Sequence, residues 1–208
     1  LEPSVDGALK IARKGVGMYR LEVQGRSAHA GLEPENGANA LLSLAGALNH
    51  VASFGDASVG TTVTPTTASA GTARNVVPDT AVCEIDVRAE SVAEMGRVDV
   101  ALRNLVPSVA DTTFNLVGGI NRPPMEAATS AELFVRAQKL WAELGHGELE
   151  GRAVGGGSDG NFTAGIGVPT LDGLGAVGDG AHARHEHVVV DEMAKRAQLL
   201  AALIDDVR

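Results

Sequence analysis

The chain has 208 residues, a formal net charge of −9 and 44% hydrophobic residues, with only 3% aromatic. This length suits one large domain or two small ones, with a core built mainly from Ala, Val and Leu. An acidic chain repels phosphate groups, so we expect no nucleic-acid partner. No apolar run reaches the ~18 to 20 residues that span a bilayer, so we expect no membrane partner. The single cysteine, Cys83, excludes an internal disulfide and fits a reducing compartment, which makes the cytoplasm our expectation.

The segment from 17 to 119 alternates between expected strands and expected helices. Strands are predicted where apolar and polar residues alternate, and helices where apolar residues recur every three or four positions. The resulting order is β-α-β-β-α-β, which is typical of a ferredoxin-like unit with a four-stranded antiparallel sheet and two helices on one face. The expected strands are residues 18–24, 61–70, 80–89 and 113–117.

Within this segment the pattern also predicts which residues face the core. Asn36 is expected to cap the first helix, and Pro65 pushes the second strand toward a sheet edge. Cys83 lies on the inward face of an alternating strand and is expected to be a core residue without chemistry. The two helical stripes consist of Leu41, Leu44, Leu48 and Val51, and of Met95, Val98, Leu102 and Leu105.

From residue 120 the pattern changes to alternating helices and short strands, which favours an α/β layer. We expect a helix at 130–145, a Gly-rich loop, a short strand at 169–174 and a final helix at 190–207. Residues 1–16 and 120–208 are expected to form one partial α/β domain into which 17–119 is inserted. The inward residues of the last helix are predicted to be Met193, Ala197, Leu200, Ile204 and Val207.

Three of the six histidines lie in the stretch GAHARHEHV, at positions 182, 185 and 187. Histidine nitrogen is a preferred zinc ligand, but the spacing matches neither H-E-x-x-H nor H-x-x-E-H. A metal site, a catalytic site and a solvated polar loop therefore all remain open here, and spacing alone favours the solvated loop.

Other candidate features are weaker when each is taken alone. The glycines of GGGSDGNF could expose amides to an anion, although a tight turn is the simpler interpretation. Arg122 and Arg152 could bind a carboxylate through two parallel hydrogen bonds, although most arginines are surface residues. His29 lies in an uncrowded loop, and Asn75 is a turn residue of the kind that is normally structural.

Taken in order, LEPS, GRSAHAGLEPENGANAL, GTARNVVPD, GGGSDGNF and GAHARHEHV resemble the aminoacylase/carboxypeptidase family of two-zinc metallohydrolases. The chain is most similar to the glutamate carboxypeptidase type. The resemblance implies the C-terminal part of a zinc-bearing α/β domain, interrupted at 17–119 by a ferredoxin-like dimerisation or lid domain. It also implies a homodimer formed through that inserted domain.

The same resemblance implies roles for individual residues. Glu2 would be a ligand of one zinc and His182 a ligand of the other. His29 would be the catalytic lid histidine that reaches the partner subunit's active site and polarises the scissile carbonyl. The residues that would bind substrate are Asn75, Arg122, Arg152, Gly156 and Gly157.

The family's remaining site residues have no counterpart in these 208 residues: a histidine ligand, a bridging aspartate and a Glu-Glu pair. The start, LEPSVDG, has no Met and is typical of a cut into a longer protein. We therefore expect this chain alone to be inactive and to bind zinc weakly.

The parent is expected to be a zinc-dependent carboxypeptidase or amidohydrolase, with two zinc ions in its complete site. It would cleave an amide bond next to a carboxylate-bearing amino acid, in a peptide or an N-acyl amino acid. The alternatives are a non-catalytic dimerisation module or pseudoenzyme fragment, and a metal-buffering loop built on His185 and His187.

Overall fold

The structure is a computed structural model that describes residues 1–207. The chain divides into two compact units, which are described separately below. One unit comprises Gly15–Arg122, and the other combines Leu1–Lys14 with the residues from Pro123 onward. Within the described part of the chain, no helix is both long and apolar enough to cross a membrane.

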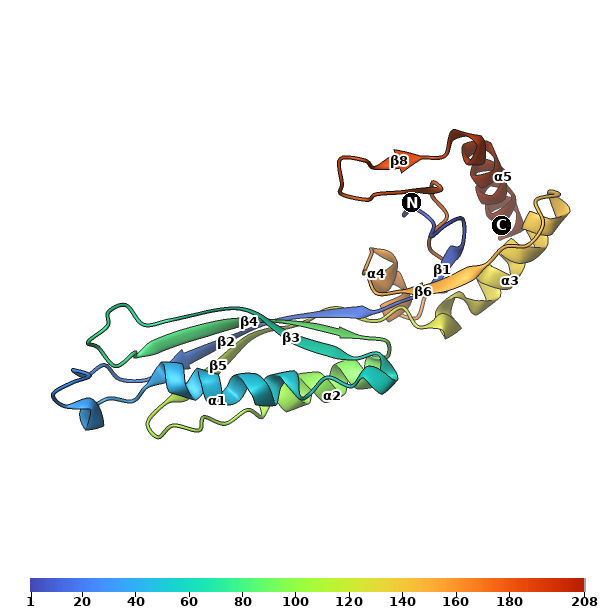
Figure 1. The fold of residues 1–208 in the computed structure, drawn as a ribbon. Helices are drawn as coiled ribbons and strands as arrows, with labels where there is room; N and C mark the ends of the chain where they lie inside the picture. The colour runs from blue at the N-terminus through green and yellow to red at the C-terminus, as the bar shows by residue number, and fades with distance from the viewer. Residues whose placement is uncertain (208) are drawn as a thin grey trace. The chain divides into compact units, whose positions relative to one another are not determined.

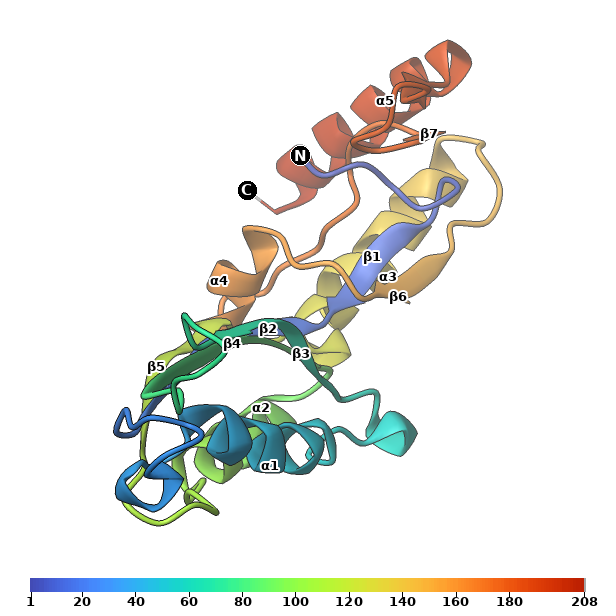
Figure 2. The ribbon, with the colours of Figure 1, turned by 60° about the vertical axis from the view of Figure 1, so that its left-hand side comes forward.

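The unit Gly15–Arg122 is built on an antiparallel sheet with the strand order β3-β4-β2-β5 (Figure 1). Two helices, α1 (Ala40–Ala52) and α2 (Val92–Arg103), cover one face of this sheet (Figure 2). The predicted ferredoxin-like architecture is therefore confirmed, with β3 at the expected edge. The strands are β2 (Gly15–Gln24), β3 (Thr62–Ala70), β4 (Thr80–Ala89) and β5 (Thr113–Arg122), and the 3₁₀ turns are η1 (Pro34–Asn36) and η2 (Ala57–Val59).

The core of this unit lies between the sheet and the two helices, because alternate residues of β4 and one stripe of each helix are buried. Two expectations at α1 are wrong. Asn39, and not Asn36, is its N-cap, since its side chain accepts from the Leu42 amide at 3.0 Å. Leu41 is 45% exposed. Because the helix starts later, Ala40 and Ala47 share the buried stripe instead.

The outer limits of the sheet also differ from the expected ones. β2 begins at Gly15 and β5 ends at Arg122, since the two strands stay paired beyond the alternating stretch. A register shift between Val16 and Gly17 accommodates this extension. Alternation of side chains alone could not predict those ends.

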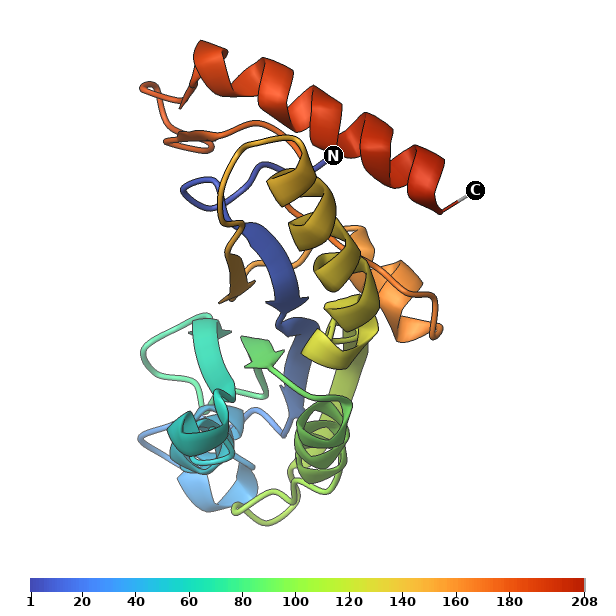
Figure 3. The same cartoon turned by 90° about the vertical axis from the view of Figure 1, so that its right-hand side faces the viewer.

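The other unit is centred on a two-stranded parallel sheet of β1 (Leu9–Arg13) and β6 (Gly151–Val154). Helices α3 (Ala127–Glu143) and α5 (Val190–Asp206) pack together against β1 (Figure 3). The short elements are α4 (Gly160–Gly165), β7 (Gly178–Asp179) and β8 (His187–Val188). The buried core residues are Leu9, Ala137, Trp141, Leu149, Leu199 and Leu203.

Two further expectations fail in this unit. Residues 169–174 do not form a strand, and only an isolated bridge joins Asp172 to Lys10 of β1. The buried face of α5 carries Arg196, Leu199 and Leu203 in place of the predicted stripe. The reason is Arg196, whose guanidinium lies 5.5 Å from the Trp141 ring centroid and donates to the Gly7 carbonyl.

Candidate functional site

Glu2 and the segment leading to His182 lie side by side, although they are far apart in the sequence. The Gly175 amide donates to the Glu2 carbonyl at 2.8 Å, and the Ser4 amide donates to the Ala176 carbonyl at 2.9 Å. This close approach of the two segments requires a glycine, since a Cβ at Gly175 would lie 2.6 Å from the backbone carbonyl oxygen of Glu2. The Glu2 carboxylate is 50% exposed and so remains accessible to a ligand.

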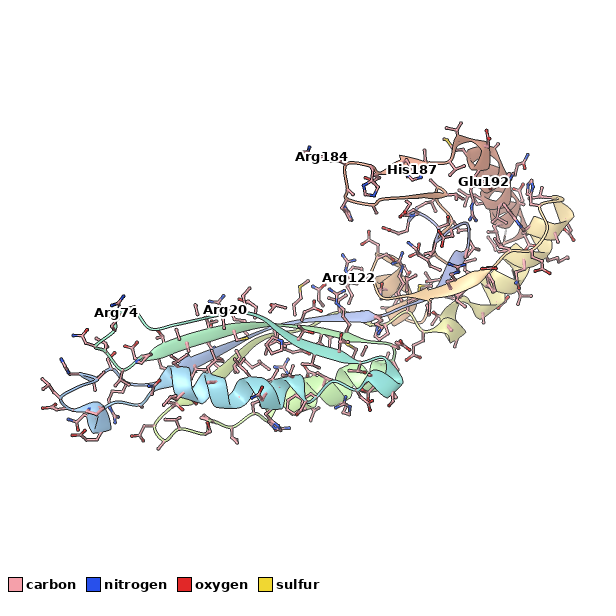
Figure 4. The ribbon with its side chains drawn as sticks, viewed as in Figure 1. Arg20, Arg74, Arg122, Arg184, His187 and Glu192 are labelled. Carbon is pink, nitrogen blue, oxygen red and sulfur yellow. The ribbon has the colours of Figure 1, made fainter. Side chains whose placement is uncertain are left out.

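His182 occupies the loop between β7 and β8, with φ = +67°, a left-handed conformation that is uncommon for residues other than glycine. His185 and His187 are also exposed in this hairpin, where His187 Nδ1 lies 3.1 Å from the His185 carbonyl. Arg184 projects from the same loop (Figure 4). Across residues 1–207, no three His, Cys, Asp or Glu side chains are grouped so that they could hold a metal ion.

The possible ligand atoms within residues 1–207 therefore do not form a three-ligand zinc site, and no chemical step through zinc follows from them. What the unit does contain is a cavity of about 250 Å³ next to both segments. Lys10 lines it from β1 and is only 9% exposed. Burial, and then the neighbouring Arg13 charge, lowers the pKa of the Lys10 ammonium. The polar residues around the cavity are Ser4, Asp6, Lys10, Asp179, Glu186 and His187.

Arg13, at the end of β1, joins three parts of this unit. Its Nε donates to Asp172 Oδ2 at 2.6 Å, and its Nη1 donates to the Gly156 carbonyl at 2.6 Å. The Arg13 side chain is 3% exposed, and its buried Nη2 has no hydrogen-bond partner among the described residues. That Nη2 lies 3.9 Å from Glu2 Oε2. A buried guanidinium thus faces the Glu2 carboxylate while holding the Gly-rich loop.

The Gly-rich loop is fixed by a buried polar network around Asp172. Burial alone would raise the pKa of Asp172, but hydrogen bonds from Ser158 and Gly173, together with Arg13, hold it below its usual range. Asn161 completes the network, since its Oδ1 accepts from the Ser158 amide at 2.8 Å. Its Nδ2 donates to the carbonyls of Lys14 and Pro123 at 3.2 and 2.8 Å. The glycines at 156 and 157 are therefore positioned by buried side chains that the sequence analysis did not single out.

Arg152 lies on β6, where its guanidinium already has two partners. Its Nη1 is 3.0 Å from Asp6 Oδ2, and its Nη2 is 3.2 Å from Glu150 Oε2. A ligand carboxylate would have to displace these partners. The role of Arg152 in substrate binding stays a prediction.

In the unit Gly15–Arg122, the structure brings His29 and Asn75 together. The Ala30 amide donates to the Asn75 carbonyl at 2.9 Å, and an isolated bridge joins His29 to Val76. Both residues are exposed, at the end of the sheet where Arg74 projects (Figure 4). Arg122 lies half-buried at the end of β5. The roles of these three residues in substrate binding or catalysis stay predictions.

The residues that sequence analysis missed have one feature in common: they are charged or polar, and yet buried. Lys10 and Arg13 lie in the strand LKIAR among buried apolar residues, and a cation within such a strand could have drawn attention to them. Asp172 and Asn161 gave no comparable signal. Asp172 pairs with Arg13, which is 159 residues distant along the chain, and Asn161 donates to the carbonyl of Lys14, which is 147 residues distant.

Comparisons with known proteins agree with this architecture. Residues 11–113 match the M20 peptidase dimerisation domain. Carboxypeptidase G2 from Pseudomonas sp. (strain RS-16) is 26% identical over 208 residues, which cover 97% of this chain and 49% of that protein.

Two solved structures have the same fold. The crystal structure of aminopeptidase PepT from Bacillus cereus superposes with a TM-score of 0.76 at 23% identity, over 99% of this chain and 55% of that one. The aminobenzoyl-glutamate utilization protein from Klebsiella pneumoniae gives a TM-score of 0.65 at 20% identity, over 97% and 52%. The chain spans about half the length of these relatives. As the resemblance predicted, residues 11–113 belong to the dimerisation domain of the M20 peptidase family, and the chain as a whole is similar to carboxypeptidase G2.

Proposed function

We propose that this chain forms a homodimer and supplies part of the active site of a zinc-dependent carboxypeptidase or amidohydrolase. The substrate would be a peptide or N-acyl amino acid, cleaved at the amide bond next to a carboxylate-bearing amino acid. The observation that carries this proposal is the pairing of the Glu2 segment with Gly175–Ala176, which leads into the loop of His182. Both proposed ligand segments thereby lie along one side of the same unit.

Zinc would be held by Glu2 and His182 together with ligands that these 208 residues do not provide. When bound, zinc would polarise the scissile carbonyl and activate water. This chain's own contribution is positional. Arg13 faces the Glu2 carboxylate at 3.9 Å and holds the Gly156 carbonyl, while buried Lys10 adds positive charge beside the neighbouring cavity. A site bordered by two cations suits a substrate that carries a carboxylate.

His29 and Asn75 would act on the active site of the partner subunit, as the family resemblance implies. The hydrogen bond from the Ala30 amide to the Asn75 carbonyl supports such a joint role, because it joins the loop of His29 to the loop of Asn75. The alternative, a dimerisation module without catalytic function, is favoured by the lack of a three-ligand group in residues 1–207.

Sedimentation velocity tests the homodimer directly. We expect a mass of twice 21.3 kDa at micromolar concentration. A species that stays monomeric at 100-fold higher concentration would contradict the dimer. Hydrolysis of N-acyl glutamate by a longer polypeptide that contains this chain tests the enzymatic part, with His29→Ala as the variant expected to abolish turnover. Unchanged turnover in that variant would count against the proposed role of His29.

A further inference from the structure

We propose that the loop after β2 fixes the tautomer of His29, so that its Nε2 carries the ring proton and serves as a hydrogen-bond donor to a ligand oxygen. The proposal concerns which ring nitrogen donates and which backbone groups decide it. The assignment of the ring proton to Nε2 stands on geometry alone, and the donation to a ligand oxygen rests on the proposed function.

The geometry at the ring determines the tautomer. His29 Nδ1 accepts hydrogen bonds from the amides of Gly31 and Leu32, both at 3.1 Å. A backbone N–H can only donate, so Nδ1 must be unprotonated and must share its lone pair between the two amides. A neutral imidazole carries one ring proton, which therefore resides on Nε2. No group in the described part of the chain forms a hydrogen bond with that Nε2, and the His29 side chain is exposed.

The loop that supplies these amides is tied at several points, so the two hydrogen bonds belong to a fixed structure. Arg26 and Ala38 exchange backbone hydrogen bonds of 2.9 Å at its base. The Val77 amide donates to the Ala28 carbonyl at 2.9 Å just before His29. Gly37 allows this packing, since a Cβ there would lie 2.9 Å from Val77 Cγ1. The loop that carries His29 is therefore held by its own turn and by the adjoining β3–β4 connection, and the two loops extend from the same end of the sheet (Figure 1).

The tautomer matters for the chemistry that this histidine can perform. An Nε2–H group donates to the oxygen of a carbonyl, a carboxylate or a developing oxyanion. The opposite tautomer would present a lone pair to the same oxygen and repel it. The Gly31 and Leu32 amides are thus positioning groups, and they act on a ligand only through the ring.

The ring nitrogens of ¹⁵N-labelled protein report the tautomer without any substrate, metal or activity. At a pH where His29 is neutral, we expect a long-range ¹H–¹⁵N spectrum with an unprotonated Nδ1 and a protonated Nε2. His50, whose ring contacts Phe54 and lies outside this loop, is the internal comparison and should sample both tautomers. A protonated Nδ1 at His29, or a mixture like that of His50, would overturn the proposal.

Two replacements of His29 distinguish the acceptor at Nδ1 from the donor at Nε2. In His29→Asn, the side-chain oxygen takes the place of Nδ1, so the amides of Gly31 and Leu32 should keep their hydrogen-exchange rates within about twofold. In His29→Gln, the acceptor at that position is lost while a distal donor remains, so both amides should exchange about five- to tenfold faster. Equal rates in the two variants would contradict the proposal. Because neither measurement involves hydrolysis, failure of the proposed function would leave these outcomes unchanged.

Discussion

Replacing Asp172 with Asn removes the negative charge at the centre of the network that holds the Gly-rich loop. The Asp172 carboxylate accepts from Arg13 Nε at 2.6 Å, from Ser158 Oγ at 2.6 Å and from the Gly173 amide at 2.6 Å. The side chains of Arg13 and Asp172 are 3% and 10% exposed, so solvent screens their ion pair little. Removing one partner of a buried pair lowers the free energy of unfolding by about 3–5 kcal/mol, because the other charge stays buried. We expect about 3 kcal/mol, since the amide keeps one acceptor oxygen.

Tryptophan fluorescence during urea unfolding measures this loss in the unit that contains Asp172. Trp141 is the only tryptophan of the chain and is 7% exposed on α3. The matched control is Glu132→Gln, which breaks an exposed ion pair with Arg136 on the same helix and should change the free energy of unfolding by less than about 1 kcal/mol. Adding Arg13→Met to Asp172→Asn should recover part of the loss, because the Arg13 guanidinium is then no longer buried without its Asp172 partner. A loss below about 1 kcal/mol for Asp172→Asn would refute the assignment of this network as a stabilising centre.

Three further outcomes follow from individual groups. The folded pKa of Asp172 lies below its ordinary 3.8, so its stabilisation is fully present above about pH 4 and is lost as the pH falls through the folded value. When Trp141 fluorescence is used to measure the free energy of unfolding against pH, the loss of stability at acid pH should therefore be smaller in Asp172→Asn. An unchanged loss at acid pH would contradict this. Tyr19 is the only tyrosine, and its pKa is raised by burial and then by its hydrogen bond to Asp99 at 2.9 Å. The free energy of unfolding of its unit should therefore decline as the pH rises above the ordinary value of 10.0. Absorbance at 295 nm that titrates near pH 10 in the folded protein would exclude this shift. Leu21→Ala, at a fully buried position of β2, should reduce the free energy of unfolding followed by the Tyr19 signal by about 2–5 kcal/mol, whereas a loss under about 1 kcal/mol would show that the site is not packed as described.

The inserted ferredoxin-like unit could be predicted from the sequence because its two central strands, β2 and β4, each have one buried face. Alternation such as Ala81, Cys83, Ile85 and Val87 then identifies a strand directly. The helix α5 shows where this reasoning fails. Its most apolar stripe, which includes Met193 and Ile204, is exposed, and its buried face includes an arginine.

The site was predictable only in part, and for a similar reason. Short motifs with unusual residues, such as those around Glu2, His29 and His182, have a family signature that can be read locally. The groups that position them cannot be read in this way. Arg13 acquires its role from Asp172 and Gly156, and those contacts exist only after the chain has folded.

Zinc titration followed by NMR tests the central claim most directly. If this chain supplies one ligand to each of two zinc ions, Zn²⁺ should bind weakly and should perturb the signals of Glu2 and His182, with His185 and His187 unaffected. The changes should disappear in Glu2→Gln and His182→Gln respectively, and the chain alone should hydrolyse no N-acyl amino acid. A tight stoichiometric site with hydrolysis by this chain, or zinc bound only through His185 and His187, would contradict the account.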